Sequence, residues 1–206
     1  MPRLFLAILF LLLSKTSLAI PTSKQNIVVL GDSISAGYGL DIGQGWVNLV
    51  QQKLLAENGC CQIINESISG DTSAGGLARL EPILTNHKPN VLILELGAND
   101  GLRGLPTPAL KQTLAEIIHR AQQAGAKVLL LSMRIPPNYG KRYVDLFYAV
   151  YPQLAKEMGI TSVPFLMEDI ALVKDLMQAD GLHPNAKAQP IIADKVWQHL
   201  QPLLKP

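Results

Sequence analysis

Cysteine is scarce in this 206-residue sequence, and the two cysteines, Cys60 and Cys61, are adjacent. Neighbouring Cα atoms lie about 3.8 Å apart, which is closer than the usual disulfide range. A strained bond between the two is a rare alternative. We expect Cys61 to enter a strand as a small apolar residue, with Cys60 at the turn before it. None of the four histidines stands at ligand spacing from a cysteine or a second histidine, so the sequence predicts no metal site.

Net charge is also small, with 18 basic and 16 acidic residues and no basic run. Loss of residues 1–19 takes Arg3 and Lys15 from the 18 basic residues and leaves 16, against 16 acidic ones. A neutral chain without a basic patch lacks the electrostatic footprint of a nucleic-acid-binding protein. Nucleic acid is therefore excluded as an expected partner, whereas apolar or lipid-like substrates are compatible with this composition.

Long apolar runs are confined to the N-terminus, where Leu4–Leu13 follows Arg3 and precedes Ser17–Ala19. A positive charge, a short apolar segment and small residues before a cleavage point are typical of a secretory signal peptide. The alternative is a transmembrane anchor, but the run has ten residues and a bilayer requires roughly 20. We expect cleavage after residue 19, no stable membrane anchor thereafter, and a periplasmic or secreted location.

Apolar runs alternate with helix-period segments through residues 20–206, which contain no linker and no internal repeat. Strands are expected at Ile27–Leu30, Gln62–Asn65, Val91–Leu96, Lys127–Ser132 and Ser162–Phe165. Helices are expected at Trp46–Asn58, Ser73–His87 (bent or split by Pro82), Thr107–Ala124, Arg142–Met158 and Ala186–Leu200. Continuous apolar strands between helices indicate a parallel sheet covered on both faces. The sequence therefore predicts a single α/β domain, a three-layer α/β/α sandwich around a five-stranded parallel sheet.

Polar segments follow the first three expected strands, at the sheet edge where ligands bind in such folds. These segments are Gly31–Ser35, Glu66–Thr72 and Gly97–Gly101, and a fourth, Asp180–Pro184, precedes the last helix. The carboxyl ends of parallel strands meet at one edge, so all four segments can converge on one site.

The four segments contain the groups that acyl transfer requires: a serine, a histidine that takes its proton, and a carboxylate that fixes the histidine tautomer. Ser33 follows a glycine turn, and His183 lies three residues after Asp180, close enough for the carboxylate to reach the near ring nitrogen. Candidate oxyanion-hole donors are the N–H groups of Ser33 and Gly70 and the side-chain amide of Asn99. We predict Ser33 as the nucleophile, His183 as the base and Asp180 as its orienter.

Each of these residues has a simpler interpretation when taken alone. An isolated Ser33 is most simply a helix N-cap, Asp180 with His183 a capping pair, and Asn99 and Gly70 turn residues. Their occurrence together, each at a strand end or in the last loop, favours the catalytic interpretation.

Other polar residues receive structural interpretations. Asp32 and Asp100 flank the predicted site residues and are expected to accept hydrogen bonds that brace turns or loops. His87, His119 and His199 are expected on helix surfaces or ends, away from the chemistry.

Two other classes of protein are alternatives to this catalytic interpretation. An α/β-hydrolase lipase needs the pentapeptide G-x-S-x-G, which is absent here, and its nucleophile normally follows several strands rather than the first. A non-enzymatic binding module with the same fold is the other alternative. All predicted catalytic positions hold chemically competent residues, so nothing in the sequence indicates a dead site.

The motifs GDSIS, ISGDTSAGG, GANDG and DGLHP together resemble the SGNH (GDSL) hydrolase family over essentially the whole chain after residue 19. In the first motif, Ile34 stands where the family name GDSL has leucine. The resemblance implies a flavodoxin-like fold, cofactor-free hydrolysis through a serine, and the same roles for Ser33, Gly70, Asn99 and His183. Within the family, the sequence resembles in particular the bacterial periplasmic branch of multifunctional thioesterases, lysophospholipases and arylesterases.

The resemblance also implies where an acyl chain binds. The loop at about Gly101–Pro106 is expected to cover the chain, and Leu102, Leu105, Ile135 and Pro136 are the expected lining residues, with plain loop packing as their alternative role. The expected substrate is a small-molecule acyl ester or thioester, and the enzyme is expected to be a monomer. A carbohydrate O-acetyl esterase using the same catalytic groups is the alternative function.

Overall fold

The computed structural model describes residues 25–57 and 61–204. The expected signal peptide and the Cys60 half of a possible vicinal disulfide lie outside these residues. Cys61 begins the second strand and is buried, as expected for a small apolar residue. No helix among the described residues has the length and apolarity to cross a membrane.

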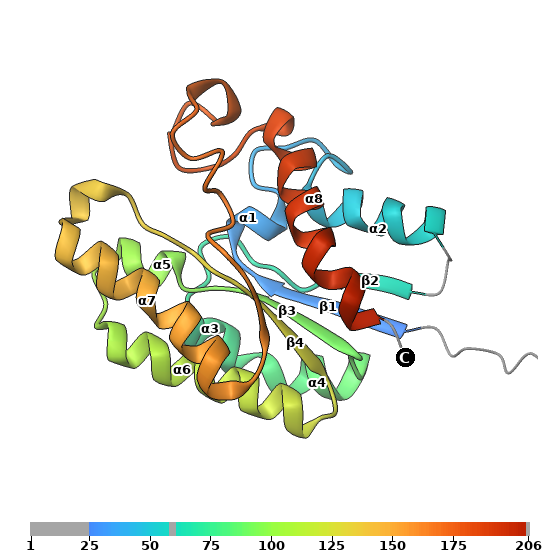
Figure 1. The fold of residues 1–206 in the computed structure, drawn as a ribbon. Helices are drawn as coiled ribbons and strands as arrows, with labels where there is room; N and C mark the ends of the chain where they lie inside the picture. Colours follow the sequence, from blue (N-terminus) through green and yellow to red (C-terminus); the bar gives the residue numbers. More distant parts are fainter. Residues whose placement is uncertain (1–24, 58–60, 205–206) are drawn as a thin grey trace, which may run out of the picture.

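Five parallel strands form one sheet in the order β2-β1-β3-β4-β5 (Figure 1). They are β1 (Gln25–Gly31), β2 (Cys61–Asn65), β3 (Val91–Glu95), β4 (Lys127–Leu131) and β5 (Thr161–Val163). This is the flavodoxin-like strand order, in which the chain winds one way from β1 and the other way from β3. The predicted five-stranded parallel sheet is confirmed.

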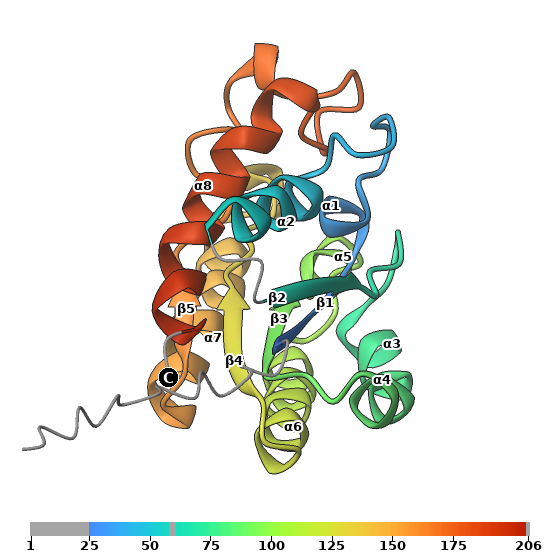
Figure 2. The same ribbon diagram turned by 90° about the vertical axis from the view of Figure 1, so that its right-hand side faces the viewer.

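Helices cover both faces of the sheet (Figures 1 and 2). One face carries α2 (Trp46–Glu57) and α8 (Gln189–Leu200), and the other carries α3 (Ser73–Ala78), α4 (Leu80–His87), α6 (Thr107–Gln123) and α7 (Lys141–Met158). Two short helices directly follow strands: α1 (Ser33–Ala36) after β1 and α5 (Ala98–Leu102) after β3. The 3₁₀ turns are η1 (Pro137–Tyr139), η2 (Lys174–Leu176), η3 (Ala186–Ala188) and η4 (Gln201–Leu204).

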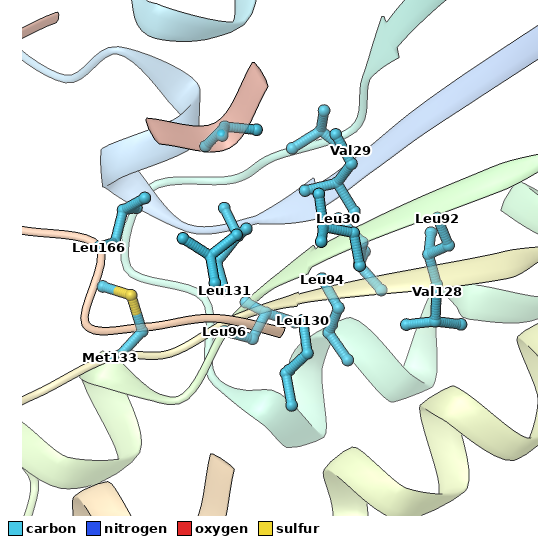
Figure 3. Close-up of a cluster of buried hydrophobic side chains, with 14 of the residues drawn as sticks. Val29, Leu30, Leu92, Leu94, Leu96, Val128, Leu130, Leu131, Met133 and Leu166 are labelled. Atoms are coloured by element: carbon cyan, nitrogen blue, oxygen red, sulfur yellow. The ribbon is translucent and has the colours of Figure 1, made fainter. Parts of the chain in front are cut away.

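The core occupies both interfaces between sheet and helices. Every residue of β3 is buried, because helices cover its two faces, which explains why the strand reads as a continuous apolar run. Figure 3 shows part of this core; its labelled residues are Val29, Leu30, Leu92, Leu94, Leu96, Val128, Leu130, Leu131, Met133 and Leu166. The predicted three-layer sandwich is therefore confirmed.

Local differences from the sequence prediction occur mainly at helix ends. The expected helix Ser73–His87 is split at Arg79, and Pro82 then lies in the first turn of α4, where its missing N–H costs nothing. The segment after β3 forms a helical turn, α5, rather than an open loop. Gly97 is the N-cap of this turn, and two features favour glycine at this position. Its φ is 111°, and a Cβ would lie 2.4 Å from Tyr151 Oη.

Candidate active site

The strand order creates a crevice between the carboxyl ends of β1 and β3. The connections that leave these two strands run to opposite faces of the sheet, and such switch points are where open α/β folds bind ligands. Ser33 follows β1 and Asn99 follows β3, so both lie at this crevice.

Ser33 is the first residue of α1. Asp32 caps this helix with its side chain, which accepts a hydrogen bond of 3.1 Å from the N–H of Ile34. The hydroxyl oxygen Oγ of Ser33 lies 2.8 Å from Nε2 of His183, 150 residues later in the chain. The predicted serine–histidine pair is thus brought within hydrogen-bonding distance.

His183 belongs to the loop between β5 and α8, and its other ring nitrogen, Nδ1, lies 2.6 Å from Oδ2 of Asp180. The second oxygen of Asp180 accepts from the backbone N–H groups of Leu182, at 2.9 Å, and His183, at 3.0 Å. The ring of Tyr38 packs against the imidazole, with centroids 4.6 Å apart. These contacts fix the imidazole between a carboxylate and a serine hydroxyl.

The electrostatics of Asp180 favour its charged form. Desolvation raises the pKa of this carboxyl, but hydrogen bonds from the backbone and ring of His183 and from Leu182 N–H outweigh that effect and lower the pKa to about 2. At neutral pH the charged Asp180 favours the imidazole tautomer of His183 that has its proton on Nδ1. The lone pair of Nε2 then faces Ser33.

Two of the predicted oxyanion donors, Asn99 and Gly70, come from the segments that follow β3 and β2. The Nδ2 amide of Asn99 donates to Asp32 Oδ2, at 3.1 Å, and to the carbonyl of Asp71, at 2.9 Å. Gly70, with a φ of 80°, immediately precedes Asp71 and uses a backbone conformation that glycine adopts readily. Asn99 therefore connects the segments after β1, β2 and β3 at one point.

A second carboxyl, Glu95, was not predicted as part of the site. Its Oε2 accepts from Ser35 Oγ at 2.6 Å and from Asp32 N–H at 3.2 Å, beneath the turn that carries Ser33. Burial is the main cause that raises the pKa of Asp32 to about 6 and the pKa of Glu95 well above its ordinary value, and the proximity of Asp32 raises the latter further. Glu95 is the single charged residue in the run VLILEL, a signal that could have identified it.

A cavity of about 680 Å³ opens beside Ser33, Asn99 and His183. Of the predicted lining residues, Leu102, Ile135 and Pro136 line this cavity. Leu105 does not: it is 41% exposed, and its carbonyl accepts from Tyr143 Oη at 2.7 Å. The turn of α5 carries Leu102 toward the cavity and Leu105 past it. Further apolar lining residues, which the sequence did not reveal, are Met133, Val144, Phe165, Met167, Ala171, Leu172 and Met177.

The other expected polar residues have structural contacts. Asp100 accepts from the N–H and the hydroxyl of Ser73, at 2.8 and 2.6 Å, which confirms it as a bracing acceptor, and Asp32 acts as an N-cap. His87 pairs with Glu66, the first residue after β2, at 2.7 Å. Residues 25–57 and 61–204 contain no cluster of three or more histidine, cysteine or acidic residues that could hold a metal ion.

Comparison with known proteins gives consistent matches. The GDSL-like Lipase/Acylhydrolase family matches residues 29–190. "Esterase TesA" of Pseudomonas aeruginosa is 50% identical over 182 residues, which cover 88% of this chain and 90% of that protein. "Thioesterase 1/protease 1/lysophospholipase L1" of Escherichia coli K12 is 44% identical over 182 residues, covering 88% and 86%.

A solved structure agrees with these matches. The psychrotrophic esterase EstA from Pseudoalteromonas sp., whose crystal structure was determined inhibited by monoethylphosphonate, superposes with a TM-score of 0.83. It is 43% identical to this chain, and the match covers 87% of this chain and 98% of EstA.

Proposed function

The chain belongs to the GDSL-like Lipase/Acylhydrolase family and is an ester-bond hydrolase, and we propose that it cleaves acyl esters and thioesters through an acyl-enzyme on Ser33. The observation that carries this proposal is the continuous line of contacts from Ser33 Oγ to His183 Nε2, at 2.8 Å, and from His183 Nδ1 to Asp180, at 2.6 Å. Such a line, beside an amide donor and an apolar cavity, is what acyl transfer to a serine requires.

In the first half of the reaction, Ser33 Oγ attacks the carbonyl carbon while its proton passes to Nε2 of His183. The tetrahedral intermediate collapses when the bond to the leaving oxygen or sulfur breaks, and His183 returns the proton to that atom. In the second half, His183 takes a proton from water, the hydroxide attacks the acyl-enzyme, and Ser33 leaves with the proton. The products are the free acid and an alcohol or thiol.

The charge that develops on the carbonyl oxygen needs donors, for which we propose the N–H groups of Ser33 and Gly70 and the amide of Asn99. Both Nδ2 hydrogens of Asn99 are directed at protein acceptors, Asp32 and the Asp71 carbonyl. To accept from Asn99, the oxyanion therefore shares an Asn99 N–H with one of these acceptors or takes its place. Of the two, the carboxylate of Asp32 also accepts from Ile34, so it keeps a partner when Asn99 turns toward the substrate.

The apolar cavity supports an acyl chain as the group on the carbonyl carbon. Leu102, Ile135 and Pro136 belong to its lining, and a volume of about 680 Å³ accommodates more than an acetyl group. The name of the E. coli relative points the same way, toward thioesters and lysophospholipids, and that of the P. aeruginosa relative toward esters. We therefore favour longer acyl groups over the acetyl group of a carbohydrate O-acetyl esterase.

We also propose that residues 1–19 are a cleaved signal peptide and that the enzyme acts in the periplasm or outside the cell, on the pattern of Arg3, Leu4–Leu13 and Ser17–Ala19. Intact-mass measurement of the protein from a cell's periplasmic fraction tests this. A chain that begins at Ile20 agrees with the proposal, and a chain that retains Leu4–Leu13 contradicts it.

Labelling with a fluorophosphonate tests the nucleophile. Such probes react with activated serines, and the phosphonate in the EstA structure supports their use here. We expect one adduct, on Ser33, and loss of both adduct and ester turnover in Ser33→Ala. Ser162→Ala, in β5 at the sheet edge, is the matched control and should label like the wild type. An adduct on another serine, or turnover by Ser33→Ala, would falsify the mechanism.

Substrate class is tested separately, with p-nitrophenyl esters of increasing chain length alongside acyl-CoAs. The cavity predicts kcat/KM values that rise beyond acetate, together with thioester hydrolysis. A sharp optimum at acetate without thioester activity would identify a deacetylase.

A further inference from the structure

Arg79 stands at the junction of α3 and α4 and contacts three acceptors, two in the loop between β2 and α3 and one at the end of β1. The proposed chemistry does not otherwise explain these contacts. Its Nε donates to Asp71 Oδ2 at 2.8 Å, one terminal nitrogen donates to the carbonyl of Glu66, and the other lies 3.5 Å from the carbonyl of Gly31. The Arg79 side chain is 20% exposed and that of Asp71 is 12% exposed, so solvent screens this ion pair less than a surface pair.

Each contact lies beside a group of the proposed site. Glu66 begins the β2–α3 loop (residues 66–72), and Asp71 follows Gly70 in that loop. The carbonyl of Asp71 accepts from Asn99, at 2.9 Å. Gly31 ends β1, two residues before Ser33. A single guanidinium thus connects both ends of the loop that carries Gly70 to the strand that carries Ser33.

We propose that Arg79 is a positioning residue for the oxyanion hole: it holds Gly70 N–H and the Asn99 amide in place relative to Ser33. This inference rests on the proposed function. Arg79 does not touch the reacting atoms; it acts through Asp71 and the loop backbone.

Arginine suits this task because its guanidinium is planar and carries five N–H donors in fixed directions. Two of the three acceptors around Arg79 lie at the two ends of the β2–α3 loop and the third ends β1, and a lysine ammonium on a flexible stem does not hold all of them at once. Anchoring from the other side comes from Asp100 in α5, which accepts from the N–H and hydroxyl of Ser73. Arg79 therefore holds the β2–α3 loop directly, and Asp100 holds the start of α3, which directly follows the loop.

Gly75 gives independent support for a defined Asp71 position. A Cβ at Gly75 would lie 1.9 Å from Asp71 Oδ1, so an alanine there pushes the carboxylate away from Arg79. Gly75 lies within α3, where alanine is favoured over glycine, so the substitution displaces Asp71 without weakening the helix.

The competing explanation is a purely structural ion pair, which affects stability and not the transition state. Oxyanion donors act on charge that develops in the transition state, so their misplacement lowers kcat and leaves KM nearly unchanged. We expect kcat of Arg79→Ala, per active site titrated with the fluorophosphonate, to fall about 100-fold, with KM within about threefold. Arg79→Lys should recover only part of this loss.

Arg120→Ala is the matched control. Arg120 pairs with Glu116 on the exposed surface of α6, so the variant loses an arginine and an ion pair away from the site. Its kcat and KM should stay within about twofold of the wild type. An Arg79→Ala enzyme that keeps its titrated kcat while its thermal midpoint falls would overturn the proposal.

A readout specific to the oxyanion is the preference for an oxygen ester over the matching thionoester, whose C=S sulfur is a weak hydrogen-bond acceptor. The preference of the wild type should shrink in Arg79→Ala and in Gly75→Ala, and should stay unchanged in Arg120→Ala. An unchanged preference in both Arg79→Ala and Gly75→Ala would show that the loop donors are intact without Arg79. Ser33→Ala separates the two levels: if it retains turnover, the proposed function fails, whereas a normal Ser33→Ala result with an active Arg79→Ala refutes this inference alone.

Discussion

Two aspartates of the site use the same local hydrogen bond and have opposite electrostatics. Asp32 accepts from the N–H of Ile34 and Asp180 accepts from the N–H of Leu182, in each case two residues further along the chain. Yet the pKa of Asp32 is raised to about 6, whereas that of Asp180 is lowered to about 2.

The surroundings account for the difference. Asp32 is 1% exposed, so desolvation outweighs the hydrogen bonds that lower its pKa. Asp180 has a side chain 37% exposed, and it adds the N–H and the ring of His183 to its donors. Burial and the number of donors, rather than the local turn, decide the charge of each carboxyl. We infer that Asp180 serves the chemistry through its charge, whereas Asp32 and Glu95 support the turn that carries Ser33.

The largest expected effect is on turnover by Asp180→Asn. The amide can present an N–H to Nδ1 of His183, which shifts the proton to Nε2 and leaves no base for Ser33, so kcat should fall by roughly four orders of magnitude. Asp32→Asn is the matched variant, because asparagine is an equally good N-cap. It loses one acceptor for Asn99, and we expect a loss within about tenfold. Equal losses in steady-state kinetics of the two variants would remove the distinction between the aspartates.

For the free energy of unfolding we expect the reverse order, with a larger loss on the side of the buried Asp32 and Glu95 than at Asp180. Glu95→Ala leaves a cavity and removes the acceptor of Ser35 Oγ and Asp32 N–H, and we expect it to lower the free energy of unfolding by about 4 kcal/mol. Asp180→Ala should change it by less than about 1 kcal/mol, because its side chain lies on an exposed loop. Urea unfolding at neutral pH measures both.

Glu95→Gln is the control for the protonation of Glu95. The raised pKa of Glu95 favours the neutral form of its carboxyl, and a glutamine reproduces the shape of that form and its acceptor for Ser35. We expect a cost of about 1 kcal/mol or less. A cost equal to that of Glu95→Ala would mean that the charged form of Glu95 is the one that stabilises the fold.

The sequence was enough to predict the contact between Asp180 and His183 but not the contact between Glu95 and Ser35. Asp180 and His183 are three residues apart, so their pairing is local and can be inferred from spacing. Glu95 and Ser35 are 60 residues apart, and their contact depends on the register that places Gly31 opposite Glu95 across β1 and β3. Strand register follows from packing over the whole sheet, which a single sequence does not specify.

The same dependence on contacts between distant segments explains why the cavity lining and the role of Arg79 could not be predicted fully from the sequence. The strands and most helices followed from apolar periodicity and glycine stops, but α5 is one short turn whose extent decides that Leu102 faces the cavity and Leu105 does not. Arg79 had no distinguishing pattern at all, because its three acceptors come from segments 8, 13 and 48 residues away.

The raised pKa of Asp32 should make the free energy of unfolding depend on pH. The unfolded carboxyl ionises near its ordinary value of 3.8, whereas the folded one keeps its proton to about pH 6. The folded state therefore binds more protons between these values, and stability falls as pH rises through them, by about 3 kcal/mol for this group. Asp32→Asn should remove this component, so its stability relative to the wild type improves by about 2 kcal/mol from pH 4 to pH 7, because the unfolded carboxyl is already partly ionised at pH 4. Urea midpoints at both pH values measure this; a constant difference would mean that the pKa of Asp32 is ordinary.

The smallest expected effect has the opposite sign and belongs to Asp180. Its folded pKa of about 2 lies below its ordinary value of 3.8, so the stabilisation is complete above about pH 4 and is lost as pH falls through about 2. The side chain is more than a third exposed, so solvent screening keeps this contribution below about 1 kcal/mol. Asp180→Asn should therefore lose slightly less stability than the wild type between pH 5 and pH 2. Asp175→Asn, which changes another exposed carboxylate, in η2, controls for general acid effects. If Asp180→Asn and Asp175→Asn have the same acid unfolding curves, the donors around Asp180 do not stabilise the folded loop, and their contribution is confined to orienting His183.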